Sequence, residues 1–142
     1  MARILGIDWG ERRVGIALSD ESHTIASPHS VLVRSPSINK DLGRIFGLVN
    51  EHDVERVVVG IPIRMDGTQG PSADKVVEIV EKLRNLLDVP VVTWDERLST
   101  AEAQKVLIGG DVSRRKRKDV VDRVAAALIL QTYLDSGSWR EN

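Results

Sequence analysis

The sequence contains no cysteine. This absence excludes disulfide bonds, thiolate metal sites, iron–sulfur clusters and a cysteine nucleophile. It agrees with a reducing compartment, so we expect a cytoplasmic protein. No apolar run approaches the roughly 18–20 residues that span a bilayer, and we expect no membrane association. The first apolar segment meets an acid at Asp8, so we expect no signal peptide there.

Histidines and aromatic residues are scarce. The histidines do not have the spacing of a zinc site: His23, His29 and His52. Aromatic residues make up 4% of the chain, and the tryptophans do not cluster in sequence. Base stacking and sequence-specific readout of nucleic acid are therefore not predicted.

Three common catalytic motifs are also missing. The sequence has no GxxxxGK[ST] motif, which excludes a P-loop ATPase. It has no GxSxG motif, and its glycines do not match GxGxxG. The chemistry must therefore be sought in other residues.

The composition predicts one globular domain over residues 1–142, since 42% of the residues are hydrophobic and 29% are charged. Charges nearly balance, at 20 Lys and Arg against 21 Asp and Glu. The balance hides one strongly basic run, formed by Arg114, Arg115, Lys116, Arg117 and Lys118. Without this run the chain has 15 basic and 21 acidic residues. One strongly positive segment therefore belongs to an otherwise acidic chain.

The first third of the chain reads as β-structure. Apolar runs at 3–9 and 13–19 are separated by three residues that suit a hairpin. A third run at 24–33 contains Pro28, which removes a backbone donor, so we expect an edge strand or a bulge.

Helices and strands alternate after Ser37, which we expect to cap a helix. The apolar run 56–61 predicts a buried parallel strand. We then expect a loop at 64–72, a helix capped by Ser72 and a strand at 90–94. A third helix is predicted from a capping box of Ser99 and Glu102 to the pair Gly109 and Gly110, and a last helix over 119–135. The order predicts an α/β fold with a mixed five-stranded sheet, in which three antiparallel strands precede alternating α and β elements.

Three acids occupy positions that suggest chemistry. Asp8 and Glu96 come at the ends of predicted strands, where α/β sheets bind their ligands. Asp122 lies on the apolar side of the last helix, which could bring it to the same edge. Converging carboxylates repel one another, and a hard cation such as Mg²⁺ or Mn²⁺ relieves that cost.

Each acid also has a simpler interpretation. Asp8 can end a strand in a turn, and Glu96 can form a surface ion pair. Asp119 and Asp122 can favour the dipole at a helix N-terminus, which is the better interpretation for Asp119. The metal hypothesis therefore depends on all three acids of the set converging.

The basic run likewise allows two interpretations. Five adjacent like charges commonly form a solvated, mobile loop. The run also precedes the helix that carries Asp122, where a polycation would hold a phosphate backbone.

Four segments together resemble the YqgF/RuvX family of Holliday junction resolvases and pre-16S rRNA nucleases. They are ILGIDWGERRVGIALSD (4–20), VVGIPIRMDGTQGP (58–71), TWDERLST (93–100) and KDVVDRVAAALILQTYLD (118–135). The resemblance covers nearly the whole chain. Trp9 departs from it, because the family usually has a smaller or aliphatic residue there.

This resemblance implies an RNase H-like fold and metal-dependent hydrolysis of phosphodiester bonds. It assigns catalysis and the binding of one or two Mg²⁺ or Mn²⁺ ions to Asp8, Glu96 and Asp122. It places Arg97 where it either contacts the scissile phosphate or pairs with Asp95 or Glu96. Residues 114–118 would bind the nucleic acid.

The implied substrates are the 5′ end of pre-16S rRNA, branched DNA such as Holliday junctions, or both. Two other functions stay open. One is an actin-like ATPase, for which 142 residues leave no room for a second enclosing domain. The other is a non-catalytic nucleic-acid-binding factor in ribosome assembly or transcription. The sequence does not indicate whether the protein is a monomer or a homodimer.

Overall fold

The computed structural model describes residues 2–64, 66–98 and 114–140, and for residues 114–123 it describes the backbone alone. Within these residues, five strands and three α-helices follow one another. In order they are β1 (Arg3–Trp9), β2 (Arg13–Ser19), β3 (Ala26–Val33), α1 (Ile38–Glu51), β4 (Val54–Ile61), α2 (Pro71–Leu86), β5 (Val91–Asp95) and α4 (Arg114–Ser136), with short 3₁₀ helices η1 (Glu96–Leu98) and η2 (Ser138–Arg140).

The strands form one mixed sheet in the order β3-β2-β1-β4-β5. β1 pairs antiparallel with β2 through the predicted hairpin, and β2 pairs antiparallel with β3. β4 runs parallel to both β1 and β5, as its continuous apolar run indicates. The predicted mixed five-stranded α/β fold is confirmed.

The edge position of β3 is also confirmed. Pro28 faces Ala17 of β2, directly after a shift of register between Ile16 and Ala17. Proline has no amide hydrogen to donate to a neighbouring strand. An edge strand tolerates it, because only one of its sides has a neighbour to pair with.

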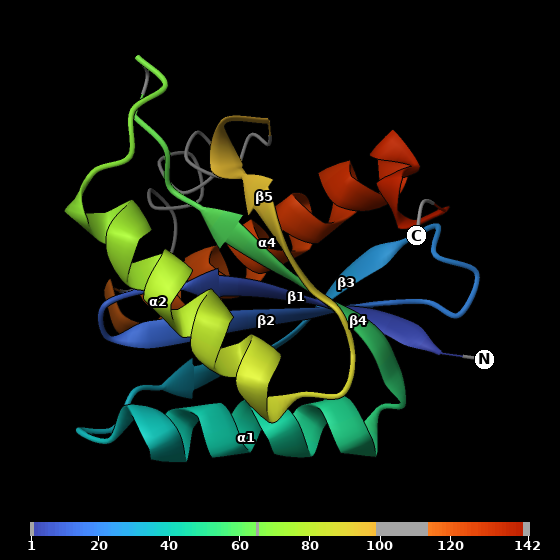
Figure 1. The fold of residues 1–142 in the computed structure, drawn as a ribbon, viewed down its shortest axis with the longest axis horizontal. Coiled ribbons are helices and arrows are strands. Elements are labelled where there is room, and N and C mark those ends of the chain that lie inside the picture. The colour runs from blue at the N-terminus through green and yellow to red at the C-terminus, as the bar shows by residue number, and fades with distance from the viewer. Residues whose placement is uncertain (1, 65, 99–113, 141–142) are drawn as a thin grey trace.

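Helices cover both faces of the sheet (Figure 1). One core cluster joins Ile7 and Trp9 of β1 to the apolar stripes of α1 and α2. The other cluster packs α4 against the opposite face, through residues such as Ile129 and Leu130. Side chains alternate along a strand, so Asp8 lies on the α4 face, between two residues that point toward α1 and α2.

The helix starts differ in part from those predicted. Ser37 caps α1 as expected, and its side chain accepts a hydrogen bond from the Lys40 amide at 3.3 Å. The expected cap at Ser72 is wrong, because α2 begins at Pro71 and its N-cap is Gly70. Proline has its φ fixed near the helical value and lacks only an amide that has no partner in the first turn.

The last helix begins at Arg114 rather than at 119, so the prediction that the basic run precedes it is wrong. Arg and Lys are strong helix formers, so a run of them can form part of a helix. Such a run has no apolar stripe, so the hydrophobic pattern does not predict the helix there. The predicted helix between Ser99 and Gly110 lies outside the described residues.

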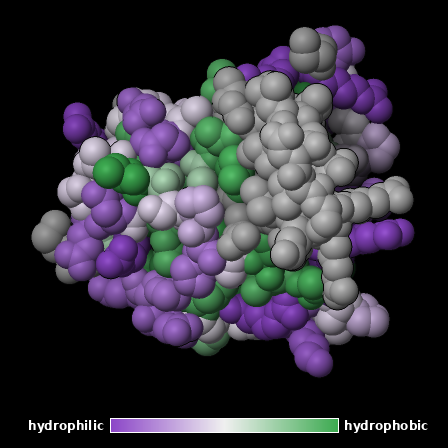
Figure 2. All heavy atoms as spheres, turned by 180° about the vertical axis from the view of Figure 1, so that it is seen from behind, coloured by the Kyte–Doolittle hydropathy of each residue, from purple (hydrophilic) through white to green (hydrophobic). Residues whose placement is uncertain are grey.

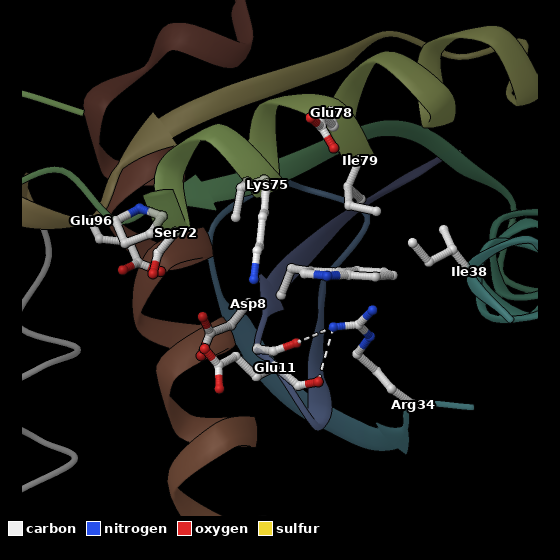
Figure 3. Close-up of a pocket in the computed structure, with 13 residues that line it drawn as sticks. Asp8, Glu11, Arg34, Ile38, Ser72, Lys75, Glu78, Ile79 and Glu96 are labelled. Atoms are coloured by element: carbon white, nitrogen blue, oxygen red, sulfur yellow. Dashed lines mark hydrogen bonds between the residues drawn. The ribbon is translucent and has the colours of Figure 1, made fainter. Parts of the chain in front are cut away.

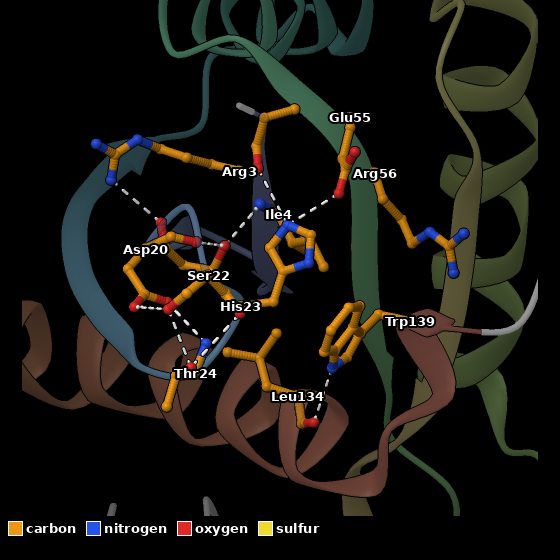
Figure 4. Close-up of polar contacts among 12 residues, drawn as sticks. Arg3, Ile4, Asp20, Ser22, His23, Thr24, Glu55, Arg56, Leu134 and Trp139 are labelled. Atoms are coloured by element: carbon orange, nitrogen blue, oxygen red, sulfur yellow. Dashed lines mark hydrogen bonds and ion pairs between the residues drawn. The ribbon is translucent and has the colours of Figure 1, made fainter.

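A separate polar cluster holds the chain ends together at the amino end of β1 (Figure 4). His23 Nε2 lies 2.8 Å from Glu55 Oε1 and 3.0 Å from the Ala2 carbonyl oxygen. The His23 ring meets the Trp139 ring edge to face at 4.7 Å, and Trp139 Nε1 donates to the Leu134 carbonyl oxygen at 3.0 Å. This cluster ties η2 to the sheet, at the end away from Asp8.

Within the described residues, no helix is long and apolar enough to cross a membrane. The view from behind shows hydrophilic side chains around the rim of the described surface and hydrophobic ones gathered nearer its centre (Figure 2).

Candidate functional site

Two acidic side chains lie together where β1 and β5 end. Asp8 is the last residue but one of β1, and Glu96 begins η1 directly after β5. Each is only 8% exposed, and both line one pocket of about 680 Å³. Figure 3 shows both carboxylates on the same side of this pocket. The sheet therefore brings together two of the three predicted acids, although they are far apart in sequence.

Two glycines let α4 approach the sheet closely beside these acids. A Cβ atom added to Gly6 of β1 would lie 2.8 Å from Leu130 Cβ and 3.2 Å from the Ala126 carbonyl oxygen. One added to Gly60 of β4 would lie 2.7 Å from Ile129 Cδ1 and 3.1 Å from Glu96 Oε1. The packing of α4 and the position of Glu96 both depend on the absence of side chains here.

The direction of α4 indicates toward which edge of the sheet the backbone at Asp122, the third acid, lies. Arg56, early in β4, donates to the Tyr133 hydroxyl at 2.8 Å, whereas Gly60, late in β4, faces Ile129. α4 therefore runs in the opposite direction to β4, and its earlier residues lie nearer the carboxyl end of β4. Position 122 lies four residues, or one turn, before Ala126, which packs over Gly6.

The α4 backbone therefore runs past Gly6 toward the edge where Asp8 and Glu96 lie. The Asp122 side chain is outside the described ones, so the convergence of all three acids stays a prediction. Among the side chains that the structure does describe, no three His, Cys, Asp or Glu residues form a metal-binding group. Asp8 and Glu96 are the two members of the expected set whose side chains are described, and both line the pocket.

Arg97 is held by Asp95 rather than by Glu96. Arg97 Nη2 lies 2.7 Å from Asp95 Oδ2, and Arg97 Nε donates to both carboxylate oxygens. These hydrogen bonds hold the pKa of Asp95 below its ordinary value and raise the pKa of Arg97. Of the two alternatives for Arg97, the structure shows the ion pair, and the phosphate contact stays a prediction.

The basic run occupies the first turns of α4, so its interpretation as a loop is wrong. Its side chains lie outside the described ones. Asp119 follows the run within the helix, and α4 has no acid in its first turn. The interpretation of Asp119 as an acid at the helix N-terminus is therefore also wrong, because the dipole effect fades within one turn.

Sequence reasoning missed the residues that complete the pocket. Lys75 and Ser72 come from the first turns of α2, and Glu11 and Arg34 border the β1–β2 turn. Arg34 Nη1 donates to the Gly10 and Glu11 carbonyl oxygens at 3.3 and 2.9 Å, which fixes that turn. One signal was available: α2 follows β4, so its first turns had to begin near the carboxyl edge of the sheet.

Solved structures that this chain resembles define its fold. RuvC from Thermus thermophilus in complex with a Holliday junction matches with a TM-score of 0.61 at 16% identity, over 97% of this chain and 98% of that one. The fowlpox virus Holliday junction resolvase matches with a TM-score of 0.56 at 13% identity, over 94% and 99% of the two chains. At such low identity these matches show the fold, which is the RNase H-like fold of these resolvases.

The sequence comparisons define the family. The model described as "RuvX: Holliday junction resolvase" matches residues 2–136. A relative from Desulforamulus reducens is 48% identical over 96% of this chain and 98% of its own, and one from Desulforudis audaxviator is 50% identical over 94% of each. Both carry the name "Putative pre-16S rRNA nuclease". The chain belongs to the RuvX family, and the resemblance drawn from its motifs is confirmed.

Proposed function

We propose that this protein is a metal-dependent nuclease that hydrolyses phosphodiester bonds in nucleic acid. One observation carries the proposal: two buried carboxylates, Asp8 and Glu96, line one pocket at the carboxyl edge of the sheet. The third acid, Asp122, is carried toward that edge by α4. Family membership and the names of the relatives support the same activity.

The donor chemistry of these residues fits a hard divalent cation. Asp8, Glu96 and Asp122 offer carboxylate oxygens alone, and the chain has no cysteine that would favour a softer metal. A divalent cation that binds several carboxylates offsets the cost of bringing negative charges together. In this proposal the three residues hold one or two Mg²⁺ or Mn²⁺ ions. A metal bound there would supply an activated water and neutralise charge on the scissile phosphate.

The chain's own residues then do three things. The carboxylates orient the cleavage centre, and the Ala126–Gly6 packing fixes the helix that brings Asp122 to it. The basic residues 114–118 precede Asp122 in the same helix, so they hold the phosphate backbone near the acids. Cleavage leaves a 5′-phosphate and a 3′-hydroxyl.

The comparisons favour RNA as the substrate. Relatives that share about half of their residues with this chain are named for pre-16S rRNA, whereas the Holliday junction resolvases of known structure share only the fold. We therefore propose the 5′ end of pre-16S rRNA as the first substrate and branched DNA as the second. The same proposal places the activity in the cytoplasm, with a structured nucleic acid as the partner.

Neutralising the basic run should change how salt affects binding. Replacing residues 114–118 with glutamine removes five positive charges and keeps a good helix former at each position. In this proposal the five charges neutralise up to five phosphates. The slope of log K against log salt should fall by about 0.7–0.9 for each phosphate that is no longer neutralised. Fluorescence anisotropy with a labelled RNA across a salt series measures this slope. Lys40→Gln combined with Lys82→Gln, on α1 and α2, controls for a general change in charge, and an unchanged slope in the run variant would exclude phosphate binding by residues 114–118.

A cleavage assay tests the proposed function itself. Rigorously purified protein is incubated with pre-16S rRNA and with a four-way DNA junction, each with Mg²⁺, Mn²⁺ or EDTA. We expect metal-dependent cleavage of the rRNA precursor at its 5′ end. Binding without cleavage of either substrate would contradict the nuclease and support a non-catalytic factor in ribosome assembly or transcription.

A further inference from the structure

The pocket at Asp8 and Glu96 is larger than a metal centre requires. Its volume is about 680 Å³. A Mg²⁺ ion keeps six ligands, and six waters of ~30 Å³ each occupy roughly 200 Å³. Two fully hydrated ions would therefore leave part of the pocket empty. The volume falls in the range of about 300–1,000 Å³ that is typical of small-molecule sites.

Three apolar side chains line the end of the pocket away from Glu96, beside the charged Arg34 and Glu78. They are Trp9, Ile38 and Ile79, from β1, α1 and α2 respectively. The Arg34 guanidinium carbon lies 5.0 Å from the centroid of the Trp9 ring, so one face of that ring is already covered. The part of Trp9 that stays accessible, 9% of the residue, borders the pocket, where it can contact a flat group that needs few hydrogen bonds.

A lysine lies between these apolar side chains and the acids. Lys75 extends from α2 into the pocket toward Asp8 (Figure 3). It makes no hydrogen bond or ion pair with any residue in the described part of the chain. Glu78, one turn further along α2, also lines the pocket but does not pair with it. An ammonium placed this way suits a phosphate that lies between a base and the cleavage centre.

We propose that this pocket binds one unpaired nucleotide of the substrate beside the acids. Its base lies against Trp9, Ile38 and Ile79, and its phosphate contacts Lys75. The inference rests on the proposed function for its biological use, and it specifies the substrate as one with an unpaired nucleotide next to the scissile bond. The binding itself is independent of metal and of cleavage, so the two proposals can fail separately.

Binding of adenosine 5′-monophosphate and of ribose 5-phosphate, both in EDTA, tests this proposal. The indole N–H signals of the three tryptophans are followed by NMR, and Trp9→Phe identifies the signal of Trp9. We expect adenosine 5′-monophosphate to shift that signal and to leave the other two in place, since Trp94 and Trp139 donate their indole N–H groups elsewhere. Ribose 5-phosphate should bind more weakly, because it has no base for the apolar wall.

Two variants separate the phosphate contact from the base contact. Lys75→Gln should weaken binding of both compounds by about tenfold, which is the size of one charge-assisted hydrogen bond. Ile38→Ala should weaken only the nucleotide. Lys82→Gln, exposed on the same helix, should change neither.

Three results would overturn the inference. They are equal nucleotide affinity in Lys75→Gln and Lys82→Gln, an unmoved Trp9 signal, or no binding at millimolar nucleotide. If RNA is cut but the nucleotide does not bind, the subsite fails and the nuclease stands. If the nucleotide binds as described and no nucleic acid is cut, the nuclease fails and the subsite stands.

Discussion

Asp8→Asn should lower the rate of cleavage roughly 1,000-fold or more, because it removes a charged metal ligand from the reaction centre. The amide has nearly the shape of the carboxylate, so it fits the same space at a residue that is 8% exposed. The fold should therefore persist. Binding to nucleic acid should persist as well, because we assign it mainly to residues 114–118. Single-turnover cleavage, circular dichroism and fluorescence anisotropy measure the three properties.

Asp88→Asn is the matched control, since it removes the same charge from an exposed position after α2. It should cut at the normal rate. Cleavage by Asp8→Asn at the rate of the unmodified protein would remove Asp8 from the catalytic centre. Loss of its folded spectrum would instead show that the acid is structural.

Gly6→Ala should destabilise the protein by about 1–3 kcal/mol, because a Cβ there meets Leu130 Cβ at 2.8 Å and the Ala126 carbonyl oxygen at 3.2 Å. Neither atom is the flexible end of a side chain, so α4 has to move away from the sheet. Urea unfolding should show a lower midpoint with an unchanged slope. Cleavage should also fall in the protein that remains folded, because the same helix carries Asp122.

Gly43→Ala is the opposite case for the same substitution. Gly43 lies in α1, and an added Cβ would have nothing within 4 Å. Alanine should raise stability by about 0.5–1 kcal/mol through its better helix propensity. If Gly6→Ala stabilises the protein as Gly43→Ala does, the close approach of α4 to β1 is not as the structure has it.

The fold was predictable where periodicity was strong. The apolar spacing of residues 76–87 indicates a helix with one buried face, because such a helix has a single way to cover a sheet. Val76, Ile79, Val80, Leu83 and Leu87 are all buried. The start of α4 was not predictable in this way, since residues 114–118 contain no apolar residue and charge alone does not distinguish helix from loop. The start of α2 was misplaced because Ser72 is a good cap, but the preceding Gly70 and Pro71 form an equally good helix start.

The site was predictable only in part for a similar reason. The alternation of β1 put Asp8 opposite Ile7 and Trp9, and the strand-end rule brought it to Glu96. Lys75 was not found, because an exposed lysine on an amphipathic helix has no sequence signal for a pocket. Its position depends on how α2 crosses the sheet between β4 and β5, which is a property of the assembled fold.

The most direct test is the affinity of the protein for Mn²⁺, measured by the loss of the electron paramagnetic resonance signal of the free ion. Asp8→Asn, Glu96→Gln and Asp122→Asn should each weaken Mn²⁺ binding by at least about tenfold, and Asp88→Asn should leave it unchanged. Asp122→Asn is the decisive variant, because its side chain has to join two acids that the sheet already brings together. Unchanged Mn²⁺ affinity in Asp122→Asn would contradict a three-carboxylate metal centre.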